Sequence, residues 1–193
     1  MTHDTALHSD GDRPAGGGPA LGAAALTTGL MAGSFFIFAC AVMPGLARAS
    51  DRAYIEVMQH INEVIQNPVF FAGFAGALLS TGFAAWRLRR TPLRWWVLGA
   101  LVAYAAAFVL TAAVNVPLND DLDAAGDPAR IADPGAVRAE FEDPWVSWNV
   151  VRAALCVLAF GLVARALVLW GRLSRPAAQA TGVAPAAGSS ASR

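Results

Sequence analysis

Four long apolar stretches constrain this chain more than any other feature of its sequence. Three of them contain no charged residue, and the fourth contains two arginines. A helix needs about 20 predominantly apolar residues to cross the hydrocarbon core of a bilayer, and an isolated strand cannot satisfy its backbone there. We therefore predict an all-α fold, a four-helix transmembrane bundle with spans at residues 20–43, 69–86, 95–118 and 145–170.

The composition agrees with a membrane location. Hydrophobic residues make up 56% of the chain and charged residues 15%, whereas about 25% of the residues of a soluble domain are charged. The formal net charge is zero, which argues against nucleic acid as a partner because phosphate binding requires a basic surface. The partners to expect are membrane lipid and hydrophobic small molecules.

The two ends of the chain differ from its apolar middle. Residues 1–19 and 173–193 are rich in Gly, Pro, Ala and Ser and show no apolar periodicity. Such segments bury too little apolar surface to fold, so we predict a disordered leader, a membrane domain over 20–172 and a disordered tail. A cleaved signal peptide is the alternative for the first span, but its apolar region is too long and the leader too acidic.

Residues 50–66 predict a helix of a different kind. Apolar residues cover about half of its circumference, and Asn62 interrupts that apolar face. Ser50 or Asp51 can cap its start, and Asn67-Pro68 ends it and begins the second span. This helix is too polar to cross the membrane, so we expect an amphipathic helix that lies on the membrane surface or caps the bundle.

The connection from residue 119 to residue 144 is long and strongly acidic. The segment Asp120-Asp121-x-Asp123 lacks the glycine and the closing glutamate of a calcium loop, so we expect a long acidic loop in water and no metal site. Within it, Asp133-Pro134 predicts the cap and first turn of a short helix that ends near Glu142.

The distribution of arginine predicts the topology. Arginines crowd the connection between the second and third spans and also follow the fourth span. Because cytoplasmic loops carry an excess of basic residues, we predict a protein of the cell membrane with both termini cytoplasmic. The amphipathic helix and the acidic connection then lie outside.

The third span carries polar residues near its outer end. Thr111, Asn115 and Asn119 are spaced i, i+4 and i+8, so they stack on one face of a helix. Pro117 cannot donate to the carbonyl of Ala113, so the helix should kink or end there.

The fourth span adds a cation at a similar depth. Arg152 lies a turn or two below the outer end, on one stripe with Trp145, Asn149 and Cys156, and Trp148 flanks it. A buried arginine requires acceptors or a ligand anion. The cluster can lock the bundle, form a ligand site in which Trp148 provides a flat wall, or do both, since a satisfied polar network at a pocket can also bind a ligand.

Small residues and cysteines leave further alternatives. Gly29 and Gly33 form a GxxxG pair that could bring a second copy close in a homo-oligomer, although a span rich in Gly and Ala often contains such a pair by chance. Cys40 and Cys156 show no metal-ligand spacing, and we expect both to be buried free thiols.

Three motifs follow one another along the chain. They are Met58-Gln-His60-Ile-Asn62-x4-Asn67-Pro-x-Phe70, Thr111-x3-Asn115-Val-Pro117-Leu-Asn119 and Trp145-x2-Trp148-Asn149-x2-Arg152. In this order they resemble the anthrone oxygenase family of small four-span proteins, over about residues 20–169. The resemblance implies oxidation of a lipophilic aromatic, such as an anthrone or a quinol, without a metal or flavin cofactor.

An oxygenase of that kind needs a base and a site for the resulting anion. Arg152 with Asn115, Asn119 and Asn149 fits the anion site, and His60 is a stronger candidate for the base than Glu63. Asn62, Asn67 and Trp148 complete the candidate substrate-binding residues. A non-catalytic membrane module that binds a lipid or hydrophobic molecule, or stabilises a partner protein, is the other open class.

The predicted topology can be tested by cysteine labelling in a chain whose own cysteines are replaced by Ala. An impermeant thiol reagent should label the Ala125→Cys variant in intact cells and the Ala178→Cys variant only after permeabilisation, because the two positions lie on opposite sides. Equal labelling of both variants in intact cells would contradict the topology.

Overall fold

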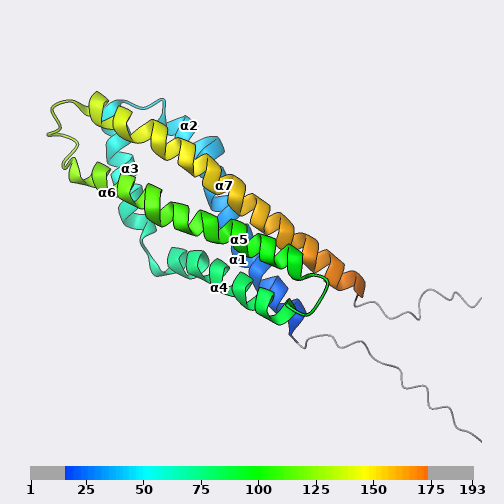
Figure 1. Ribbon diagram of the computed structural model, residues 1–193. Helices are drawn as coiled ribbons and strands as arrows, with labels where there is room; N and C mark the ends of the chain where they lie inside the picture. Colours follow the sequence, from blue (N-terminus) through cyan, green and yellow to red (C-terminus); the bar gives the residue numbers. More distant parts are fainter. Residues whose placement is uncertain (1–15, 174–193) are drawn as a thin grey trace, which may run out of the picture.

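The computed structural model describes residues 16–173, in which helices are the only regular secondary structure. The predicted leader and tail lie almost entirely outside these residues. The helices are α1 (Gly17–Ile37), α2 (Met43–Leu46), α3 (Asp51–Ile65), α4 (Pro68–Leu88), α5 (Arg94–Leu110), α6 (Val116–Ala124) and α7 (Pro134–Leu173), with π-helical turns η1 (Phe38–Val42) and η2 (Thr111–Asn115) (Figure 1).

The all-α four-span prediction is confirmed. Four continuous helical segments are long and apolar enough to cross a membrane: Gly17–Leu46, Pro68–Leu88, Arg94–Ala124 and Pro134–Leu173. The first joins α1, η1 and α2, and the third joins α5, η2 and α6. The third and fourth segments are longer than predicted because their polar outer parts continue the helices beyond the apolar runs.

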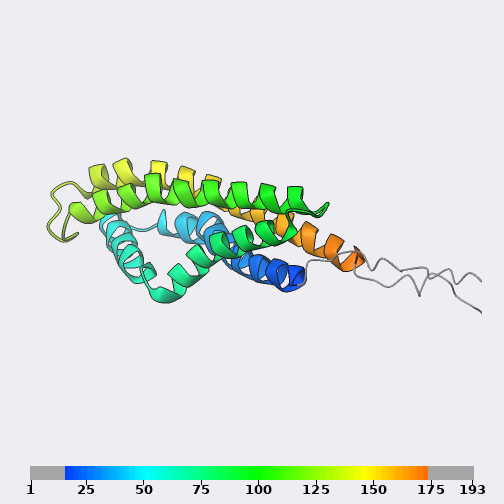
Figure 2. The same cartoon turned by 60° about the horizontal axis from the view of Figure 1, so that its bottom comes forward.

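α7 packs against α1 and α5, and α4 packs against the same two helices. Figures 1 and 2 both show the α5–α6 segment running beside α7, while α3 and α4 meet at an angle. Small residues fill the contacts, as expected where helices approach closely in a membrane. Thr27 and Ser80 hydrogen-bond between α1 and α4 at 2.9 Å.

The two glycines proposed for oligomerisation occupy different surroundings. A Cβ atom at Gly29 would lie 3.1 Å from the Phe160 ring, so the missing side chain admits α7 of the same chain. Gly33 faces open space. A homo-oligomer through Gly33 stays a proposal.

The cysteine expectation is right in part. Both thiols are free, but Cys156 is buried and Cys40 is exposed. Cys40 lies in η1, none of whose residues is buried, so this turn directs it away from the bundle.

Polar caps determine where the outer helices begin, as the sequence predicts. Ser50 accepts a hydrogen bond from the backbone of Ala53 at 3.4 Å. Asn67 accepts from the backbone of Val69 and of Phe70, each at 3.0 Å, and so caps α4. α3 buries its apolar face, which includes Tyr54 and Asn62, against α6 and α7.

The acidic connection is mostly helical, contrary to the expectation of a long loop. α6 continues to Ala124, and only residues 125–133 lie outside helices. Asp133 caps α7 by accepting from the backbone of Ala136 at 3.0 Å, as predicted. The helix then continues through Pro144 into the fourth span, because buried Phe141 and Trp145 keep both sides of the exposed proline packed.

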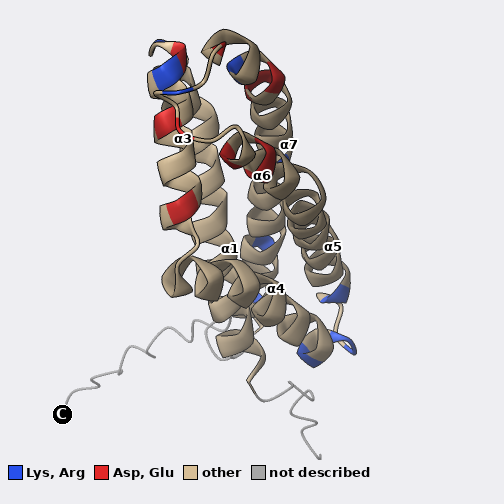
Figure 3. Cartoon of the chain, turned by 90° about the vertical axis from the view of Figure 1, so that its left-hand side faces the viewer, with Lys and Arg blue, Asp and Glu red and all other residues tan. Residues whose placement is uncertain are grey.

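Acidic residues gather at one end of the bundle (Figure 3). Every acidic residue between 16 and 173 lies within 51–63 or 120–143, at the end formed by α3, α6 and the start of α7. The other end carries the arginines of the α4–α5 connection. Which end faces the cytoplasm stays a prediction.

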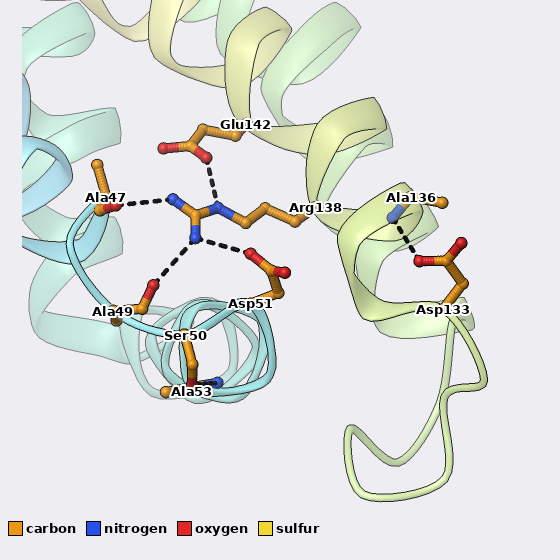
Figure 4. Close-up of polar contacts among 9 residues, drawn as sticks. All are labelled: Ala47, Ala49, Ser50, Asp51, Ala53, Asp133, Ala136, Arg138 and Glu142. Atoms are coloured by element: carbon orange, nitrogen blue, oxygen red, sulfur yellow. Dashed lines mark hydrogen bonds and ion pairs between the residues drawn. The ribbon is translucent and has the colours of Figure 1, made fainter.

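Arg138 fastens the α2–α3 turn to α7 (Figure 4). Its guanidinium donates to Glu142 at 2.6 Å, to Asp51 at 3.0 Å, and to the carbonyls of Ala47 and Ala49 at 3.0 and 3.1 Å. Its guanidinium carbon also lies 4.6 Å from the centroid of the Tyr54 ring. One side chain therefore joins three segments of the outer end.

Replacing Arg138 should loosen this end. We expect Arg138→Ala to lower the free energy of unfolding in detergent by about 2–3 kcal/mol, since it leaves several partly buried acceptors unpaired. Arg130→Ala is the matched control: Arg130 is exposed and pairs with Asp127 in an adjacent turn, a contact that typically contributes less than about 1 kcal/mol. Equal losses in the two variants would contradict a fastening role for Arg138.

Candidate functional site

Arg152 is a buried cation near the end of the bundle that carries the acidic residues. Its side chain is on α7 and only 6% of the residue is exposed. One terminal nitrogen donates to the amide oxygen of Asn149 at 2.8 Å, and the other donates to the hydroxyl of Thr111 at 3.4 Å. Both acceptors are neutral, and no acidic residue within 16–173 forms an ion pair with Arg152. The charge of this guanidinium is therefore uncompensated by the described chain.

Aromatic rings complete the surroundings of Arg152. Its guanidinium carbon lies 4.1 Å from the ring centroid of Phe35, on α1, and 5.6 Å from that of Trp145. The indole N–H of Trp145 donates to the amide oxygen of Asn119 at 2.7 Å, which fixes the ring. Cation–π contacts of this kind are strongest where water is excluded, so the rings offset part of the cost of burying the charge.

Several polar atoms around Arg152 are unpaired. Asn115 is 1% exposed, and neither its amide nitrogen nor its amide oxygen has a hydrogen-bond partner in the described chain. The same is true of the amide nitrogen of Asn149 and of Nε of Arg152. A buried polar group left unpaired typically costs about 1–3 kcal/mol, so such a group calls for an explanation. Within the described chain, two amide nitrogens and Nε of the guanidinium itself thus lack an acceptor, and N–H groups are the donors that an anionic oxygen requires.

The π-helical turn η2 shapes the wall of this cluster. In a regular α-helix the ring of Pro117 would collide with the carbonyl of Ala113. In η2 the N–H of Val116 bonds instead to the carbonyl of Thr111, five residues back, which adapts the helix to the proline. Of the two predicted alternatives, a kink or an end, the end is excluded, since α6 continues to Ala124. Thr111 and Asn115 are the first and last residues of this turn.

Four of the eight residues expected at the site, Asn115, Asn119, Asn149 and Arg152, lie in or next to the Arg152 cluster. Asn149 and Arg152 are directly bonded, Asn119 holds Trp145 beside them, and Asn115 lies one turn beyond Thr111. Asn62 is also buried, on the inner face of α3, and its amide nitrogen is unpaired within the described residues.

Other expected residues lie elsewhere. His60 is exposed on α3, and Asn67 uses its side chain to cap α4. Trp148 is 42% exposed, whereas Trp145 is 4% exposed and occupies the place expected of Trp148. Burial raises the pKa of the Tyr54 hydroxyl well above its usual range, so this neighbour of Arg138 stays neutral and is not a base.

Two contributors were not assigned to the site from the sequence. Trp145 lies on the stripe of Asn149 and Arg152, and that spacing could have identified it. Phe35 lies in an uninterrupted apolar span, and no signal in the sequence distinguishes it from its neighbours. No group of three or more potential metal ligands occurs within the described residues.

The fold and this cluster define a multi-pass helical membrane protein with a buried polar centre near one end of its bundle. More particularly, the chain belongs to the anthrone oxygenase family, whose sequence model matches residues 58–162. The matched segment contains Asn115, Asn149 and Arg152 but not Phe35. No curated protein and no solved structure matches the chain.

The unpaired amide predicts a contrast between two asparagines. Asn115→Leu should leave the free energy of unfolding unchanged or raise it by up to about 1 kcal/mol, because it removes buried polar atoms that lack partners. Asn149→Leu should lower it by about 3 kcal/mol, because it removes the acceptor of a buried charge. Denaturant unfolding in detergent measures both. A loss in Asn115→Leu as large as in Asn149→Leu would show that Asn115 is bonded within the fold.

Proposed function

We propose that this chain is a membrane-embedded oxygenase that oxidises a lipophilic, weakly acidic aromatic of the anthrone type at the Arg152 cluster. The observation that carries the proposal is the buried guanidinium without a carboxylate partner, bonded to Asn149 and Thr111, while the amide nitrogens of Asn149 and of Asn115, in the same turn as Thr111, are unpaired in the described chain. Membership of the anthrone oxygenase family supports the choice of substrate class.

The cluster would act on the ionisation of the substrate. An anthrone carries a methylene group between two aromatic rings, opposite a carbonyl, and loss of a methylene proton places negative charge on that carbonyl oxygen. Arg152 and the free N–H groups of Asn115 and Asn149 would stabilise this oxyanion. Each unit by which the pKa of the bound substrate falls corresponds to about 1.4 kcal/mol of stabilisation.

Oxidation then follows from the chemistry of the carbanion. Its methylene carbon reacts with dioxygen to form a hydroperoxide, which loses water to give a second carbonyl. One oxygen atom of dioxygen stays in the quinone product and the other leaves as water. All the electrons come from the substrate, so the reaction balances without a further reductant.

The proton acceptor in this scheme must be accessible to water. His60 and Glu63 are both exposed on α3. His60 lies at the edge of the polar face of α3 and Glu63 lies within that face, so His60 is the better placed of the two. We propose His60 for that role, separate from the oxyanion cluster.

Phe35 and Trp145 provide the rings against which a flat aromatic substrate would pack. They already lie on Arg152, so a planar anion could contact a ring and the guanidinium together. A non-catalytic protein that binds an anionic lipophilic molecule would use the same groups, and turnover distinguishes the two functions.

Dioxygen uptake by the purified protein with a hydroxyanthrone tests the proposal. Uptake should exceed autoxidation of the substrate, and Arg152→Lys should lower kcat/KM roughly 100-fold, because an ammonium cannot reproduce the planar fork of donors. Trp145→Phe should also lower kcat/KM, whereas Trp148→Phe, at the exposed ring, should leave it unchanged.

Two results would overturn the proposal. The first is uptake no faster than autoxidation by a folded wild-type protein that binds the anthrone, which would indicate the non-catalytic module. The second is equal activity of Arg152→Lys and wild type, which would place the reaction elsewhere.

A further inference from the structure

A second feature of the chain lies on the face between α5 and α7, away from the Arg152 cluster. An open groove of about 500 Å³ runs between the two helices. Its lining is apolar and includes Trp95, Leu98, Gly99 and Val102 of α5 with Leu155 and Leu158 of α7. Val102 is 68% exposed, so nothing in the described chain covers this surface.

The groove extends along α5 for a distance close to the thickness of one leaflet of the bilayer. On α5 its lining extends from Trp95 to Ala106. At 1.5 Å per residue this distance is about 16 Å along the helix, roughly half of a hydrocarbon core about 30 Å thick. Trp95 stands at the end of α5, next to the arginine-rich connection. An acyl chain that enters from that end would fill the groove to about the middle of the bilayer.

Two arginines stand at the entrance of the groove. The guanidinium carbon of Arg94 lies 4.9 Å from the ring centroid of Trp95, which lines the groove. That of Arg165 lies 5.7 Å from the ring centroid of Trp96. At 100° per residue, Arg165 falls on the same face of α7 as Leu155 and Leu158. Both arginines are exposed, and the described acidic residues all belong to the other end of the bundle.

We propose that this groove binds one anionic phospholipid, with an acyl chain along α5 and α7 and its phosphate held by Arg94 and Arg165. Arginine matches phosphate geometry through its planar fork of donors, and basic groups near a membrane surface attract anionic lipids. A zwitterionic lipid is less suitable, because its headgroup would bring a positive charge close to these arginines. A symmetric second copy with the same orientation in the membrane would place identical arginines against one another.

Native mass spectrometry of the detergent-solubilised protein tests the proposal with phosphatidylglycerol and phosphatidylcholine of identical acyl chains. One phosphatidylglycerol should be retained in preference to phosphatidylcholine. The double variant Arg94→Gln/Arg165→Gln should lose that preference, with retention of phosphatidylglycerol falling roughly 30-fold because two basic contacts are removed. The double variant Arg90→Gln/Arg130→Gln, which removes the same charge elsewhere, should behave as wild type.

A variant that fills the groove distinguishes lipid binding in the groove from general attraction of anionic lipid to the arginines. Val102→Trp leaves every charge in place and should reduce retention of phosphatidylglycerol. Leu79→Trp, at a residue of α4 that is 71% exposed, should not. Equal retention of both lipids, or retention unaffected by Val102→Trp, would overturn the proposal. So would a dimer that Val102→Trp dissociates, because the groove would then hold a second copy.

Discussion

The burial of a guanidinium at membrane depth is the constraint on which the outer half of this molecule depends. Hydrocarbon offers no acceptors, so the protein must supply whatever Arg152 requires. Asn149 comes from α7, Thr111 from η2 and Phe35 from α1, so three separate segments meet at one cation. Trp145 adds a ring that Asn119 holds in position. The position of α7 relative to its neighbours is thus determined by polar and aromatic contacts as well as by the small residues of the core.

Two prolines contribute to the same region through π-helical turns. η1 and η2 each end two residues before a proline, Pro44 and Pro117. In a regular α-helix each proline ring would collide with the carbonyl four residues earlier, and the π-helical turn avoids that collision. In both turns the N–H of the following residue bonds five residues back. The helices can therefore continue outwards beyond the apolar runs. η2 carries Thr111 at its first position and Asn115 at its last, so the adaptation to Pro117 also sets the spacing of two residues of the cluster.

Signals that are local in the sequence predict this structure well, and choices that depend on packing are predicted poorly. The four apolar runs and the caps at Ser50, Asn67 and Asp133 all appear as expected, because span length and capping are properties of a few neighbouring residues. By contrast, Trp145 and Trp148 are three residues apart, and only the packing of α7 decides which ring faces inwards. The continuation of α7 through Pro144 likewise depends on the burial of its neighbours. Phe35 could not be assigned, since an aromatic residue in an apolar span has no polar signal.

Asn115 distinguishes a structural lock from a ligand site. If the cluster only locked the bundle, each of its buried polar groups should form a hydrogen bond within the protein, because a buried polar group without a partner lowers the free energy of unfolding. Asn149 and Thr111 meet that requirement as acceptors of Arg152. Asn115 does not, although it is fully buried and belongs to the turn that holds Thr111. The lock therefore accounts for the two terminal nitrogens of the guanidinium, and an anionic ligand would account for Nε of Arg152 and the unpaired amide nitrogens of Asn115 and Asn149. The planar fork of arginine permits both, since different N–H groups can serve the fold and the ligand.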